Sequence, residues 1–164
     1  MMHHRRDHPD HARNGGSLNR TAASATVHCL TGCAIGEVAG MVLGTSLGWS
    51  NTATIVVSVV LAFVAGFALT ALPFLRRGYA VADAARIAFA ADAASITVME
   101  IVDNLVMLWI PGAMAASLSS PIFWGSLALS LAVAGVAAFP VNRWLIARGR
   151  GHAVVHARHG GQAP

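Results

Sequence analysis

Two long stretches of this chain contain no basic residue, and this absence is the feature that most limits the possible folds of the chain. Residues 21–75 and 87–142 contain neither Arg nor Lys. These two stretches contain nearly all the residues of four long apolar runs. Each run is near the ~20 residues that a helix needs to cross about 30 Å of hydrocarbon. The runs are residues 26–49, 52–76, 91–115 and 121–146. We therefore expect an all-α polytopic membrane protein, a bundle of four transmembrane helices with short loops.

The composition excludes an ordinary soluble domain. Of the 164 residues, 55% are hydrophobic and only 11% are charged, whereas about a quarter of the residues are charged in an average soluble protein. The net charge of +4 comes from flanks that suit anionic lipid headgroups. Basic and aromatic residues do not alternate as they do in nucleic-acid-binding surfaces, so we expect no nucleic-acid partner.

The arginine residues predict the orientation in the membrane. All eleven basic residues are Arg, and they form three blocks, whereas the loops 49–52 and 115–121 are uncharged. Because basic residues stay on the cytoplasmic side, both termini and the second loop are expected in the cytoplasm, with the helices in a bacterial inner membrane. The expected parts are a disordered His/Arg-rich tail over 1–25, a four-helix transmembrane domain over 26–146 and a second His/Arg-rich tail over 147–164.

Glycine recurs every fourth residue along the first expected span. Such overlapping G-x-x-x-G units form a ridge without side chains, which another helix can approach closely. Four helices also enclose little space by themselves, so we expect this ridge to serve helix packing in a homo-oligomer. The ridge consists of Gly32, Gly36, Gly40, Gly44 and Gly48.

Acidic side chains within the spans are the strongest functional signal. An ionisable group near the bilayer centre costs roughly 2.5 kcal/mol or more unless it is paired, protonated or hydrated. Helical spacing puts the acids of the third span on one face, and the rise per residue brings Glu37 of the first span to the depth of Glu100 and Asp103. We expect an ion pathway; the alternative is a cluster of protonated acids that holds the helices together. The pathway residues are Glu37, Asp92, Glu100, Asp103 and Asn104.

Ligand-type side chains accompany these acids. Thiol, imidazole and thioether groups bind transition metals, although Cys and Met are also ordinary packing residues, which is the alternative for each of them. The expected metal ligands are His28, Cys29, Cys33, Met41, Met99 and Met107. Both tails also repeat the spacing His-x3-His-x2-His, which could bind metal or be surface decoration. The tail residues are His4, His8, His11, His152, His156 and His159.

Three motifs carry a resemblance to a known family. HCLTGCAIGEVAGM (28–41), MEIVDN (99–104) and FPVNRWLIARGRGHAVVH (139–156) resemble an uncharacterised family of bacterial four-span membrane proteins, domain of unknown function 4396. The resemblance covers roughly residues 24–156. It implies a polytopic membrane protein with His-rich tails and no activity that can be carried over.

A metal-cation carrier or channel is the function that these patterns favour. Sulfur ligands favour Cu(I), and carboxylates favour harder ions such as Mn or Co. Copper is the preferred candidate, because Met99, Met107 and Met114 lie along the acidic face. The expected ion is Cu, Zn, Ni, Co or Mn, with no organic cofactor. The alternative is a non-transporting membrane scaffold or accessory subunit. No enzyme is expected, because no nucleophile with a base, H-E-x-x-H motif or cofactor loop occurs.

Overall fold

The structure, a computed structural model, describes residues 10–148, with side chains from residue 16 onward. Within these residues the chain forms four helices: α1 (Asp10–Ser46), α2 (Asn51–Leu75), α3 (Val81–Trp109) and α4 (Pro121–Ala147). The expected all-α bundle is confirmed.

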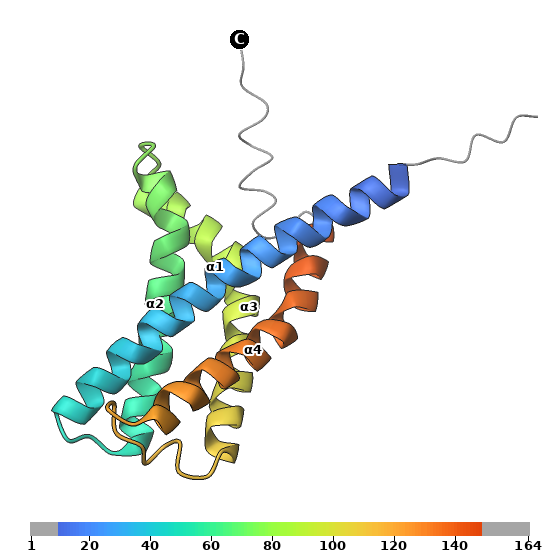
Figure 1. The fold of residues 1–164 in the computed structure, drawn as a ribbon. Helices are drawn as coiled ribbons and strands as arrows, with labels where there is room; N and C mark the ends of the chain where they lie inside the picture. The colour runs from blue at the N-terminus through green and yellow to red at the C-terminus, as the bar shows by residue number, and fades with distance from the viewer. Residues whose placement is uncertain (1–9, 149–164) are drawn as a thin grey trace, which may run out of the picture.

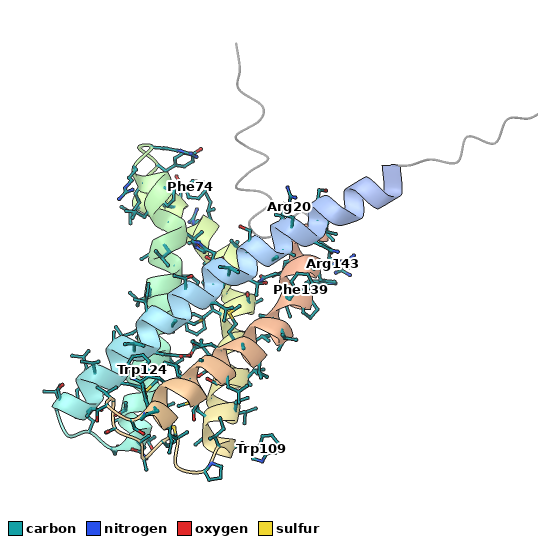
Figure 2. All side chains as sticks on the ribbon, viewed as in Figure 1. Arg20, Phe74, Trp109, Trp124, Phe139 and Arg143 are labelled. Atoms are coloured by element: carbon teal, nitrogen blue, oxygen red, sulfur yellow. The ribbon has the colours of Figure 1, made fainter. Side chains whose placement is uncertain are left out.

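The four helices have two distinct ends. Figure 1 shows the α1–α2 and α3–α4 connections at one end, which we call the loop end, and the α2–α3 turn at the other. Arg20 and Arg143 lie toward the end with the α2–α3 turn, opposite Trp109 and Trp124 (Figure 2). We call it the arginine end, because the described basic residues from three segments of the chain gather there. Those whose side chains the structure describes are Arg20, Arg76, Arg77, Arg86, Arg143 and Arg148.

Helix α1 begins well before the expected span. It is already helical at Asp10, so much of the segment expected to be a disordered tail belongs to this helix. The reason is tertiary: Ala22 and Ala25 are buried against Ile146 of α4, with Leu18 and Phe139 packed beside them. Contacts with α4 therefore stabilise the part of α1 around Ala22 and Ala25, before the expected span.

Helix α3 is shifted relative to its expected position. The third span was expected over 91–115, but α3 starts at Val81 and ends at Trp109. The end follows from Pro111, because a proline disfavours the helical conformation of the residue before it. Ile110 accordingly has extended backbone angles, and Gly112 then takes φ +82°, which suits glycine. The chain therefore turns into the α3–α4 loop earlier than expected.

Three of the helices are long and apolar enough to cross a membrane. They are Gly16–Ser46 within α1, Asn51–Leu75 and Pro121–Ala147. The 29-residue α3 carries charged residues along its length, and most of its acids are buried among the other helices. On the outside, large apolar side chains such as Val56, Val60 and Leu105 are exposed. The bundle thus presents an apolar surface to the lipid bilayer.

The glycine ridge packs against the next helix of the same chain. A Cβ atom added at Gly32 would lie 2.6 Å from the Gly66 Cα atom, and one at Gly36 would collide with the Ala62 backbone. Because α2 already occupies the ridge, the ridge no longer supports a homo-oligomer. In order, Gly32, Gly36, Gly40 and Gly44 of α1 face Gly66, Ala62, Ser58 and Thr54 of α2.

Gly48 does not belong to this ridge, and its expected packing role is wrong. Helix α1 ends at Ser46, and Gly48 lies in the following turn with φ +65°. A Cβ atom there would meet nothing within 4 Å. The glycine is suited to the left-handed backbone of the turn rather than to a close helix contact.

Candidate cation site

A cavity of about 110 Å³ opens among the helices toward the loop end. A single water needs roughly 10–15 Å³ of such space, so the cavity has room for several waters or a partly hydrated ion. Its walls include residues of the α1–α2 and α3–α4 connections as well as α1, α2 and α3. The predicted residues that it brings together are Glu37, Met41, Asp103, Asn104 and Met107.

Glu37 and Asp103 are the acidic side chains that line the cavity. Each is only 3% exposed, and their positions confirm that α1 and α3 are in contact. The two carboxyl groups are close enough to share a hydrogen bond when one is protonated, and Ser130 of α4 lies beside Asp103. Two ionised carboxylates cannot bond to each other, because both are acceptors only.

The Glu37 carboxylate lacks compensation from the surrounding protein. Neither of its oxygens has a hydrogen-bond partner among the described residues, and the same holds for Asp103 Oδ1. The described basic residues lie toward the arginine end, away from these acids. A buried acid in this situation needs a proton or a cation nearby to remain in the membrane.

Glu100 lies behind the pair and does not line the cavity. Both of its carboxylate oxygens are buried without a hydrogen-bond partner among the described residues. Its neighbours are the Cys33 thiol and Asp103. Asn104 donates its amide to the Glu100 backbone oxygen at 2.8 Å. Glu100 thus forms a second level, one step deeper into the bundle than the cavity.

A third polar level lies closer to the arginine end. His28 Nε2 and Thr70 Oγ1 are 2.9 Å apart, and the Thr70 hydroxyl also bonds to the carboxyl group of Asp92. Cys29 donates its thiol to Asp92 Oδ1 at 3.7 Å. Asp92 itself is fully buried. None of these four side chains lines the cavity, so His28, Cys29 and Asp92 form a separate polar cluster.

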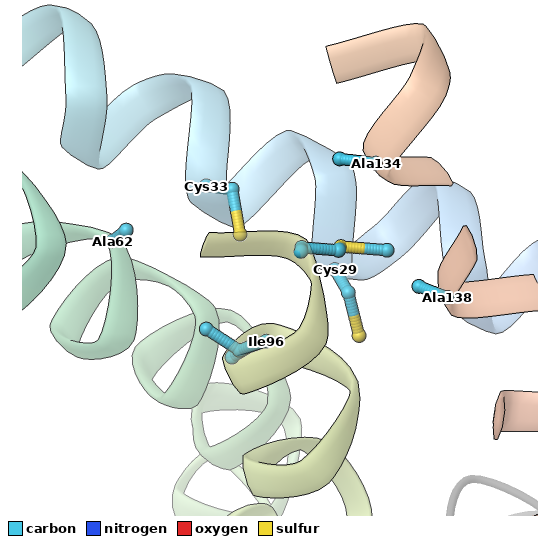
Figure 3. Packing of buried hydrophobic residues seen from close by; sticks show 7 residues of the cluster. Cys29, Cys33, Ala62, Ile96, Ala134 and Ala138 are labelled. Carbon is cyan, nitrogen blue, oxygen red and sulfur yellow. The ribbon is translucent and has the colours of Figure 1, made fainter. Parts of the chain in front are cut away.

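An apolar layer, to which the Cys29 side chain also belongs, lies between His28 and Asp92 on one side and the cavity on the other. Figure 3 shows side chains of all four helices meeting there. Met99, which is 1% exposed, packs in this layer and is not a cavity residue. The layer consists of Cys29, Cys33, Ala62, Ile96, Met99, Ala134 and Ala138. Both cysteines therefore have apolar contacts as well as an acidic neighbour.

The predicted metal ligands do not form one preassembled metal centre. Among the described residues, no group of three or more His, Cys, Asp or Glu side chains is arranged to hold a metal ion. His11 falls in a part of α1 whose side chains are not described. Outside the described residues lie His4, His8, His152, His156 and His159.

Two side chains that take part in these polar levels were not predicted from the sequence. Thr70 connects His28 to Asp92, and Ser58 lines the cavity beside the acids. Both lie on α2, whose buried small residues recur every fourth position in the same way as the glycines of α1. This matching four-residue spacing is visible in the sequence. It would have indicated that α2 packs on α1 and supplies hydroxyl groups to the interior.

The model of a protein family, described as a domain of unknown function (DUF4396), matches residues 18–151. The chain belongs to this family. The match spans all four helices except the start of α1 and confirms the resemblance found in the sequence. Comparison with the curated proteins and with the solved structures gives no match.

Proposed function

We propose that this protein is an integral membrane protein that binds and transports metal cations through the loop-end cavity. Glu37 and Asp103 are the carboxylates that bind the ion. The observation that carries this proposal is that Glu37 is almost completely buried, lacks a hydrogen-bond partner in the described protein and lines a cavity with room for an ion. A cation would supply the charge compensation that the helices do not.

The arginine end supports an orientation for this transport. By the positive-inside rule it faces the cytoplasm of a bacterial inner membrane, and the loop end faces outward. The cavity would then accept ions from outside, while the apolar layer around Ile96 and Met99 closes the route inward. An ion leaving Glu37 and Asp103 would have to pass Glu100 and Cys33 once the helices rearrange.

A scaffold or accessory subunit is the second candidate. It is favoured by the closeness of the Glu37 and Asp103 carboxyl groups, which can share one proton and so hold α1 against α3. However, a shared proton would satisfy only one oxygen of Glu37, and the buried carboxylate oxygens of Glu100 behind it have only the Cys33 thiol and Asp103 as polar neighbours. A purely structural role gives no reason for a cavity at these acids.

Cation flux into proteoliposomes tests the proposal. Wild-type protein is compared with Glu37→Gln and Asp103→Asn for Mn²⁺, Co²⁺, Zn²⁺ and Cu⁺, using an ion-sensitive dye inside the vesicles. We expect flux of at least one ion in the wild type and a loss of tenfold or more in both variants, because each removes a carboxylate from the cavity. Asp83→Asn is the matched control, since Asp83 is an exposed acid at the start of α3.

Two results would contradict transport through this site. The first is wild-type flux that equals that of empty vesicles for every ion. The second is flux that survives in both cavity variants at the level of the Asp83→Asn control. If the two cavity variants also unfold more readily than the control, the acids serve helix packing and the scaffold reading is correct.

A further inference from the structure

Three methionine side chains line the same cavity as the two carboxylates. Met41 follows Glu37 by four residues on α1, and Met107 follows Asp103 by four residues on α3. Residues four apart share a helix face, about 6 Å apart along the axis. Since both helices run toward the loop end, each thioether lies one turn nearer to that end than its acid.

The third methionine comes from the α3–α4 loop. Met114 lines the cavity although helix α3 has already ended at Trp109. The preceding Ala113 is buried. Further along the loop, the Leu118 backbone oxygen accepts a hydrogen bond at 2.8 Å from the ring N–H of Trp124, which belongs to α4. The loop is therefore anchored to α4, and it supplies a thioether from a third direction.

Met41, Met107 and Met114 differ from the fourth described methionine, Met99, because they line the cavity. Met99 shows how this chain uses the residue for packing, because it lies within the apolar layer. The cavity is different in character: its lining includes the polar side chains Thr45, Asn51, Thr54 and Ser58. Thioethers are uncharged, polarisable groups that select soft cations such as Cu(I) over hard ions such as Mg²⁺ or Ca²⁺.

We infer that Met41, Met107 and Met114 form a thioether site that selects a soft monovalent cation of the Cu(I) class and passes it to Glu37 and Asp103. This inference rests on the proposed function. The thioethers and the carboxylates have different roles. The neutral thioethers recognise the softness of the ion, and the carboxylates one turn deeper compensate its charge. Hard divalent ions would meet only the carboxylates as strong ligands.

Silver(I) binding tests the inference, because Ag(I) is soft and monovalent and is not oxidised in air. The full chain, with its methionine methyl groups labelled with ¹³C, is placed in lipid nanodiscs and titrated with Ag(I). We expect the methyl resonances of Met41, Met107 and Met114 to shift together, and that of Met99 to stay in place. Reading methyl groups excludes silver held by histidine elsewhere in the chain.

Single Met→Leu variants assign the signals and measure the contribution of each thioether. Met41→Leu, Met107→Leu and Met114→Leu are each expected to weaken Ag(I) binding at the remaining cavity methionines tenfold or more. Met99→Leu is the matched control, because this swap conserves volume in the apolar layer and should change the affinity less than twofold. The wild-type titration needs no variant, so it decides the question even if a variant folds poorly.

The outcomes separate this inference from the proposed function. If Ag(I) leaves the three cavity signals unmoved while Mn²⁺ or Co²⁺ flux still depends on Glu37, the thioether site is overturned and the transport proposal stands. If flux of every ion is independent of Glu37 and Asp103, the proposed function fails. The proposed transfer of an ion from the three methionines to these acids then fails as well. Shifts of all three signals together with Glu37-dependent Cu⁺ flux support both.

Discussion

At the scale of single residues, Thr70 illustrates how a small polar group can organise a membrane bundle. Its hydroxyl lies between the His28 ring of α1 and the Asp92 carboxyl group of α3, while Thr70 itself belongs to α2. Three helices are thus joined through one oxygen atom. Such bonds between helices in a membrane contribute about 0.6 to 2 kcal/mol each.

Replacing this hydroxyl should measurably loosen the bundle. We expect Thr70→Val to lower the free energy of unfolding by about 1 kcal/mol or more, because Asp92 and His28 lose a shared partner inside the protein. The measurement is an SDS unfolding titration in mild detergent. Thr97→Val is the control, since Thr97 is exposed and bonds only within its own helix, to the Ala93 backbone oxygen. Equal stability of the two variants would remove Thr70 from this role.

At the scale of elements, the contact between α1 and α2 depends on the absence of side chains. The glycines of α1 lie directly on small residues of α2, so the two backbones approach closely. Close approach lets dispersion contacts form along the whole interface, which drives helix association in lipid. The same contact places Glu37, which follows Gly36, next to the cavity rather than toward lipid.

A single methyl group at Gly36 should separate these helices. The added Cβ would collide with the backbone of Ala62, which cannot rotate away as a flexible side chain can. We therefore expect Gly36→Ala to destabilise the protein by about 1–3 kcal/mol, as overpacking does. Gly125→Ala on α4 is the matched control, because a Cβ there would meet nothing within 4 Å. Thermal unfolding of both variants gives the comparison; no loss of stability in Gly36→Ala would contradict the packing described for this contact.

At the scale of the whole molecule, charge separates the two ends of the bundle. The arginines gather at one end, and the cavity opens toward the uncharged loop end. By the positive-inside rule, this separation predicts that the cavity faces away from the cytoplasm. Under the proposed function, the side from which an ion would first be captured depends on this asymmetry as well as on the site.

Accessibility of introduced cysteines checks this orientation in cells. Ala115→Cys in the α3–α4 loop should react with a membrane-impermeant maleimide in intact spheroplasts. Ala80→Cys in the α2–α3 turn should react only after the membrane is opened. Both positions are exposed, whereas the native Cys29 and Cys33 are buried, so the background is low. The opposite pattern would place the cavity on the cytoplasmic side.

The membrane class, the helical fold and the depth of the acids could all be predicted from the amino-acid sequence. Long stretches that are free of arginine and rich in apolar residues predict membrane helices. The acids of α3 stand out because a charge in a span is costly. The rise per residue then placed Glu37 level with Asp103, and the structure shows the two side by side. These properties are local, so composition, spacing and periodicity suffice to find them.

Which of these residues are in contact became known only from the packing of the helices. The glycine ridge would fit a second copy of the chain as well as α2, and nothing in its spacing chooses between them. Likewise, periodicity could not indicate that Met114 lines the cavity from a loop, or that Met99 packs in the apolar layer instead. Pairing of helices and the path of a loop depend on contacts between residues distant in sequence, and a repeating pattern within one helix carries no information about its partner.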